Sequence, residues 1–191
     1  RFVGNVGWRQ DEQTFDAVRA DLALGRFKAT YAYVTRVNRI LGELRDWDSD
    51  SHLLNATWSP AEALRLQGFV YALDFQNSAP NSSVTKGVKA SGKTWVGLFQ
   101  VAYNATYAQQ GDYHGNTAGY DLDYFGADVA GTFDIYTAKL SWESLEGNGT
   151  RGFTTPLATV HAFQGWADAF VQPLGGNKGF VDGIEDLNLS F

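Results

Sequence analysis

The sequence contains no cysteine, which excludes disulfide bonds, thiol catalysis and thiolate metal sites. Methionine is absent too, and the first residue is Arg1. This predicts that a signal peptide has been removed or that the chain is a segment of a longer protein. No apolar run reaches the roughly eighteen residues that a membrane-spanning helix needs, whereas a spanning β-strand needs only about ten, half of them facing a lumen.

Proline is scarce, with 4 residues, whereas glycine contributes 21 residues and aromatic side chains make up 15% of the chain. This composition suits long strands joined by tight turns, either in a membrane barrel or in a soluble β-protein. The net charge of −6 disfavours nucleic acid as a partner. No linker divides the 191 residues, so we expect residues 1–191 to form a single barrel domain or a segment of one.

Apolar and polar residues alternate with a period of two along much of the chain, which predicts β-strands. Residues 16–24 and 28–38 alternate on either side of a short turn at Gly25 and are expected to form a hairpin. The alternation is clearest in residues 136–145, whereas residues 64–75 carry apolar side chains on both faces. The other predicted strands are residues 52–58, 93–108 (as one continuous strand), 123–133 and 183–191.

The predicted connections alternate in length. Short turns fall near Gly25, Pro60 and Asp134. The long polar loops are residues 39–51, 76–92, 109–119 and 146–182. Outer-membrane barrels place short turns on one rim and long loops on the other, and a soluble sandwich has no reason to do so. The sequence therefore predicts an all-β, antiparallel, up-and-down transmembrane β-barrel with about eight strands in this chain.

Several segments are similar to one known family. They are RFVGNVGWRQ (residues 1–10) continuing to QTFDA (13–17), TTPLATVHAFQGWAD (154–168), YAQQ (107–110) and KLSWE (139–143). These segments resemble the alginate-export family of outer-membrane proteins. The resemblance implies a monomeric, porin-like barrel in the outer membrane of a Gram-negative bacterium. It also implies a barrel longer than this chain, and the family's name-giving member exports an anionic polysaccharide.

We therefore expect a channel for passive passage or export of polar solutes, including anionic oligo- or polysaccharides. If the apolar face meets lipid, the polar face lines the pore. The side chains then predicted to line it are Arg19, Asp21, Arg36, Asn38, Asp128, Lys139 and Glu143. These charges either select solutes or pair with one another and stabilise the wall. The segment around Arg9 either folds inward, with Arg9 contacting anions, or forms an ordinary strand and turn.

Aromatic girdles are expected where the strands cross the two surfaces of the outer-membrane lipid. The predicted girdle residues are Tyr31, Trp58, Trp95, Tyr136 and Trp142. In a soluble barrel the same side chains would form the core. Their orientation therefore separates the two interpretations: in the membrane barrel Trp142 points outward while Lys139 and Glu143 point inward.

No motif for catalysis is present. The sequence has no glycine-rich phosphate loop or nucleophile elbow, and His52, His114 and His161 lack metal-ligand spacing. We therefore expect no enzyme activity, no catalytic residues, no metal and no cofactor. Two alternatives stay open: a soluble β-barrel that binds a small hydrophobic ligand, and a secreted glycosidase-like or sugar-binding sandwich that uses Trp47 or Trp166 as a stacking platform.

Overall fold

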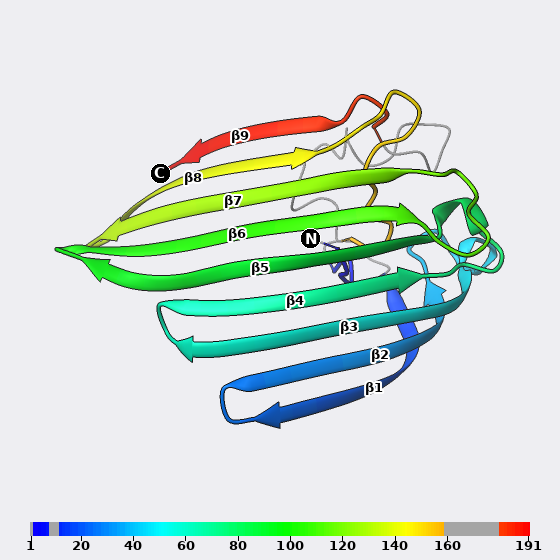
Figure 1. Ribbon diagram of the computed structural model, residues 1–191, viewed down its shortest axis with the longest axis horizontal. Coiled ribbons are helices and arrows are strands. Elements are labelled where there is room, and N and C mark those ends of the chain that lie inside the picture. The colour runs from blue at the N-terminus through cyan, green and yellow to red at the C-terminus, as the bar shows by residue number, and fades with distance from the viewer. Residues whose placement is uncertain (1, 8–11, 159–179) are drawn as a thin grey trace.

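The computed structural model describes residues 2–7, 12–158 and 180–191. These residues form one antiparallel sheet whose nine strands follow chain order (Figure 1). The strands are β1 (Thr14–Leu24), β2 (Phe27–Asn38), β3 (Trp47–Ala61), β4 (Leu64–Leu73), β5 (Ser83–Val96), β6 (Phe99–Asp112), β7 (Asp121–Phe133), β8 (Tyr136–Leu145) and β9 (Ile184–Ser190). Two short 3₁₀ turns, η1 (Glu43–Arg45) and η2 (Ala79–Asn81), lie between strands. The predicted all-β, up-and-down antiparallel topology is confirmed.

The sheet is open in the part of the chain that the structure describes. There β1 pairs with β2 alone and β9 with β8 alone. No helix among the described residues has the length and apolar character needed to cross a membrane.

The connections sort by length as predicted. Short turns join β1 to β2, β3 to β4, β5 to β6 and β7 to β8 at the left of Figure 1, and the longer connections lie at the right. Gly25 and Gly97 occupy two of these turns with φ of +57° and +62°. Two-residue hairpin turns use this left-handed region because it matches the twist of the flanking strands, and glycine enters it without steric cost.

Several predicted boundaries are wrong. The strand predicted at residues 52–58 is β3, which begins inside the predicted loop 39–51 and ends at Ala61, and β6 extends into the predicted loop 109–119. Residues 93–108 are not one strand, because a turn at Gly97 and Leu98 separates β5 from β6. Residues 76–92 are not one loop, because β5 begins at Ser83. The polar residues of this stretch belong to a strand with one polar face, and their composition alone resembles that of a loop.

Cross-strand partners share a face of the sheet, so the register sorts every strand residue onto one of two faces. The outer face is apolar and exposed: Val18, Trp58 and Leu140 keep 70%, 49% and 46% of their surface accessible. The inner face is mainly polar. One of its cross-strand rows is Ala23, Lys28, Thr57, Gln67, Lys89, Thr106, Gly126, Glu143 and Asp186.

Apolar side chains on the inner face are covered by chain segments rather than by lipid. Phe2 stacks against Phe69 of β4, with ring centroids 5.2 Å apart, and Phe153 packs on Tyr124 of β7 at 5.6 Å. In Figure 1 the N-terminal residues lie over the middle of the sheet. This explains why residues 64–75 are apolar on both faces: Leu66 and its outer-face neighbours are exposed, whereas the inner-face residues are buried under these segments.

Candidate functional site: the inner wall and its outer girdle

The inner face brings together five of the predicted pore-lining residues. They are Arg19, Asp21, Asp128, Lys139 and Glu143. Trp142 lies between Lys139 and Glu143 along β8 and, because side chains alternate, points to the outer face. This is the orientation expected of the membrane barrel and the opposite of that expected of a soluble ligand-binding barrel.

The charges of these five residues have partners. The Arg19 Nε atom lies 2.8 Å from the Asp21 carboxylate, which also accepts a hydrogen bond of 2.7 Å from Thr30. The Lys139 ammonium lies 3.3 Å from Asp128. Asn104 donates a 2.7 Å hydrogen bond to Asp128, and Tyr124 donates a 2.8 Å hydrogen bond to Glu143. The Arg19–Asp21 pair within β1 and the Lys139–Asp128 pair between β8 and β7 are each neutral overall, whereas the tyrosine partner of Glu143 leaves its carboxylate charge in place.

Arg36 and Asn38 lie on the outer face, whereas the sequence analysis predicted that they line the pore. Thr35 is an extra residue in β2, because Ala17 pairs with Val34 while Asp16 pairs with Arg36. The Thr35 hydroxyl donates a 3.0 Å hydrogen bond to the carbonyl of Asp16 at this bulge. A single inserted residue reverses the alternation beyond it. Arg36 and Asn38 therefore share the outer side of the long-loop rim with Asp16.

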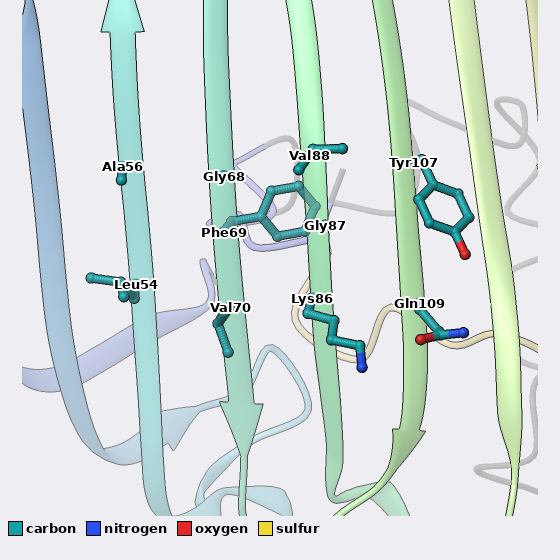
Figure 2. A pocket seen from close by; sticks show the side chains of 10 residues that line it. All are labelled: Leu54, Ala56, Gly68, Phe69, Val70, Lys86, Gly87, Val88, Tyr107 and Gln109. Atoms are coloured by element: carbon teal, nitrogen blue, oxygen red, sulfur yellow. The ribbon is translucent and has the colours of Figure 1, made fainter.

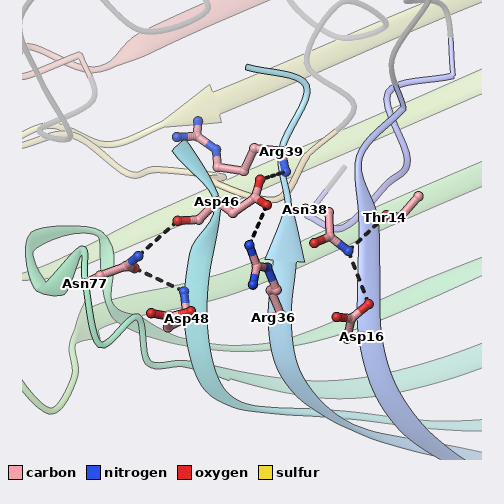
Figure 3. Close-up of polar contacts among 8 residues, drawn as sticks. All are labelled: Thr14, Asp16, Arg36, Asn38, Arg39, Asp46, Asp48 and Asn77. Atoms are coloured by element: carbon pink, nitrogen blue, oxygen red, sulfur yellow. Dashed lines mark hydrogen bonds and ion pairs between the residues drawn. The ribbon is translucent and has the colours of Figure 1, made fainter. Parts of the chain in front are cut away.

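At that rim, polar contacts fasten the connection between β2 and β3 (Figure 3). Arg36 lies 3.0 Å from the carboxylate of Asp46, which also accepts a 2.8 Å hydrogen bond from the backbone N–H of Arg39. The Arg39 N–H and the Arg36 guanidinium hold the pKa of Asp46 below its ordinary value. Arg39 stacks 3.9 Å above the Trp47 ring, and its burial lowers the pKa of its guanidinium. Arg36 thus acts as a structural tie outside the inner wall.

Three inner-face cations were not singled out from the sequence. Lys28, Arg65 and Lys89 have no ion-pair or hydrogen-bond partner among the described residues. Lys28 and Lys89 occupy one cross-strand row, with Thr57 and Gln67 between them. The alternation of residues 28–38 was a sufficient signal for Lys28. Lys89 was missed because residues 76–92, which contain it, were predicted to form a loop rather than a strand.

Two segments fold against the inner face near the long-loop rim. Gln110 of β6 is buried, and its amide donates to the Thr154 carbonyl at 2.8 Å and to the Thr85 hydroxyl at 2.9 Å. The Thr154 N–H donates back to Gln110 at 2.9 Å. The Gly4 N–H donates to the Leu157 carbonyl at 2.8 Å. For residues 2–7 the inward-folding alternative is therefore the one that the structure shows.

Some predicted features lie outside the described residues. Arg9, expected to contact anions, is one, and His161 and Trp166 are others. Within the described residues, no group of histidine and acidic side chains has an arrangement that would hold a metal ion.

Four of the five predicted girdle residues lie on the outer face: Tyr31, Trp58, Tyr136 and Trp142. Trp95 does not, because it pairs with Gln100 on the inner face near the short turns. Tyr107, which was not predicted, belongs to the outer set and donates a 3.0 Å hydrogen bond to Asp123. The Tyr31 hydroxyl lies 2.7 Å from His52 Nδ1. Both partners lie one row nearer the long loops, so these hydroxyls point towards that rim.

Three solved structures of Pseudomonas aeruginosa outer-membrane porins resemble the chain. OccK5 (OpdH) aligns over 80% of this chain with a TM-score of 0.67 and 12% identity. OccD3 (OpdP) aligns over 81% of this chain with a TM-score of 0.63 and 14% identity. OpdL aligns over 83% of this chain with a TM-score of 0.65 and 15% identity. The nine-stranded sheet therefore has the fold of part of a porin β-barrel. The chain spans 44%, 40% and 46% of the length of these three chains, respectively.

The other comparisons give no further assignment. No model of a protein family matches the chain, and the search of curated proteins found no match. The porin fold agrees with the barrel that the sequence resemblance implied, without pointing to the alginate-export family in particular.

Proposed function

We propose that the chain forms part of the wall of a bacterial outer-membrane channel through which polar solutes diffuse. The observation that supports this most strongly is the inverted distribution of side chains. Leu140 and Trp142 are 46% and 40% exposed on the outer face, while Lys139, which directly precedes Leu140, pairs with Asp128 on the inner face. Lysine on the lipid side would cost about 2–4 kcal/mol at the bilayer midplane, so this arrangement suits lipid outside and water inside.

We propose further that the channel favours anionic solutes. The inner-face carboxylates Asp21 and Asp128 are neutralised by Arg19 and Lys139, and Glu143 and Asp186 add negative charge at β8 and β9. Lys28, Arg65 and Lys89 gather on β2, β4 and β5, where they have no ion-pair partner among the described residues. Unpaired cations in a pore with low-dielectric walls raise the local concentration of anions. The sequence resemblance to the alginate-export family points the same way, to an anionic oligo- or polysaccharide. We expect the channel to act as a monomer, without catalysis or a cofactor.

The inward-folded segments supply a means of narrowing the passage. Residues 2–7 and 152–158 cover part of the inner face near the long-loop rim, held by Gln110 and by the Gly4–Leu157 hydrogen bond. A solute that enters from this rim meets these segments before it reaches the row of Lys28 and Lys89. The segments therefore limit the size of the solutes that pass, and the cations select solutes by their charge.

The experiment is a measurement of ion selectivity in planar bilayers across a KCl gradient. The double variant Lys28→Gln and Lys89→Gln should lower the ratio of anion to cation permeability severalfold, because two unpaired charges leave the wall. The matched control is Lys86→Gln, which removes one charge from β5 on the outer face and is compared with the single variant Lys89→Gln in the same strand. An equal effect in both variants, or none in either, would show that the inner cations do not set selectivity.

A further inference from the structure

The outer face carries a groove between β3, β4 and β5. One part of it has a volume of about 440 Å³ and is lined by Leu54, Val70, Val88 and Tyr107. A second part of about 420 Å³ continues towards the short turns between Phe27, Trp58 and Leu66. The two parts share Ala56, Gly68 and Val88. The groove is therefore long, narrow and apolar.

The groove exists because its floor is made of small residues. Ala56 and Gly68 pair with each other across β3 and β4. Leu54 and Val70 flank them towards the long loops (Figure 2), and the next outer-face pair towards the short turns is Trp58 and Leu66. A Cβ atom added at Gly68 would find no other atom within 4 Å. Nothing in the packing of this position requires glycine, so the open space is available to a ligand.

A single cation stands at one end of the groove. Lys86 and Gln109 pair across β5 and β6 and lie at the end nearer the long loops (Figure 2). Lys86 is exposed and has no ion-pair or hydrogen-bond partner among the described residues. Arg36, the other cation on this face of β2 to β5, is paired with Asp46. An apolar groove that ends at an unpaired ammonium complements a ligand with an apolar chain and an anionic head.

The position of Lys86 relative to the apolar belt fixes its depth in a membrane. Towards the long loops, the belt ends at a line of polar residues. Lys86, Gln109 and Asp123 form one cross-strand row, His52 lies one outer-face row nearer the long loops, and Ser144 lies one row further from them. Because the tyrosine hydroxyls of the girdle point to the same line, it marks the interface where lipid phosphates lie. In outer-membrane barrels the long loops face the exterior, so this interface belongs to the outer leaflet.

We propose that the groove binds an anionic, phosphate-bearing lipid of the leaflet at the long-loop rim. One acyl chain lies along Ala56 and Gly68 between the flanking side chains, and the Lys86 ammonium contacts the lipid phosphate. This inference rests on the membrane placement proposed above but not on the channel's selectivity. The outer face would then contain one specific lipid site within a surface that otherwise meets the bulk lipid of the membrane.

Native mass spectrometry of the full chain in detergent micelles tests the site. Phosphatidylglycerol and phosphatidylcholine with identical acyl chains are the two probes, and inorganic phosphate is added as a competitor. We expect the chain to retain phosphatidylglycerol about tenfold more than phosphatidylcholine, because the choline cation of the latter offsets the attraction between its phosphate and the Lys86 ammonium. Displacement of the lipid by inorganic phosphate would show an anion site without an acyl-chain groove, and would overturn the proposal.

Two variants with matched controls separate the contribution of the lipid head group from that of the acyl chain. Lys86→Gln should abolish the preference for phosphatidylglycerol, while Lys89→Gln, on the inner face, should leave it unchanged. Gly68→Leu should reduce retention of both lipids about tenfold by filling the groove. Its control, Gly131→Leu, is an outer-face substitution in β7 with equally open surroundings and should have no effect.

The outcomes distinguish this proposal from the proposed function. Equal retention of the two lipids by chain that is folded in detergent, or an equal loss in Lys89→Gln, would overturn the lipid site and leave the channel intact. Folding to a monodisperse protein in plain buffer without detergent would overturn the membrane placement itself.

Discussion

Two glycines on neighbouring strands have opposite reasons for being small. A Cβ atom at Gly87 in β5 would lie 2.4 Å from the ring of Phe69 and 2.6 Å from the carbonyl oxygen of Tyr107. The inner face at this point has room for one large ring, and Phe69 takes it. Gly68 in β4, on the outer face, has no such neighbour. A glycine in a strand is thus a packing requirement in one case and an open surface in the other.

This contrast yields a stability prediction. Gly87→Val should lower the free energy of unfolding by about 1–3 kcal/mol, because the added methyl groups displace Phe69 or the backbone of β6. Gly68→Val should change it by no more than about 0.5 kcal/mol. Urea unfolding in detergent micelles, followed by far-ultraviolet circular dichroism, measures both. Equal losses in the two variants would show that strand propensity, and not the contact with Phe69, decides the effect.

At the scale of elements, alternation located a strand wherever one face is apolar and the other polar. It gave β8 its observed bounds, residues 136–145. It failed at the turn between β5 and β6, because Leu98 and its neighbours are apolar and no polar residue interrupts the pattern. It also failed beyond the bulge at Thr35, which adds one residue without a compositional signal. The mistaken placement of Arg36 and the missed Lys89 follow from such local errors of phase and boundary.

One buried side chain makes three hydrogen bonds with the inward-folded loop after β8. Gln110 is 1% exposed and bonds to Thr154 through both ends of its amide. Gln110→Leu should release residues 152–158 from the inner face, because the leucine leaves the backbone N–H and carbonyl of Thr154 unpaired. The expected results are faster proteolytic cleavage within residues 146–158 and a higher single-channel conductance.

A neighbouring residue provides the control for the loop prediction. Gln109→Leu makes the same chemical change one position earlier in β6, on the outer face, and should alter neither cleavage nor conductance. If Gln110→Leu leaves the cleavage rate and the conductance unchanged as well, the contacts of Phe2 and Phe153 with the sheet suffice to hold the segments.

For the whole molecule, the division into an apolar and a polar face was predictable because it repeats in every strand. The composition of the inner wall was not, because it depends on contacts between strands. Alternation along β8 was enough to assign Lys139 to the polar face, but its pairing with Asp128 arises from a register that no single segment contains. The unpaired charge of Lys28 and Lys89 likewise becomes visible only when the rows are assembled.

The same division predicts how the molecule responds to one charge on either face. Leu140→Lys places an ammonium in the middle of the outer belt and should weaken folding into bilayers by about 2–4 kcal/mol. Ser141→Lys, one residue along β8, places it beside Asp128 on the inner face and should cost little. The measurement is the fraction of heat-modifiable protein in vesicles of defined lipid as urea is varied. A larger loss for Ser141→Lys than for Leu140→Lys would mean that the polar face meets the lipid, and the assignment of inner and outer faces would have to be reversed.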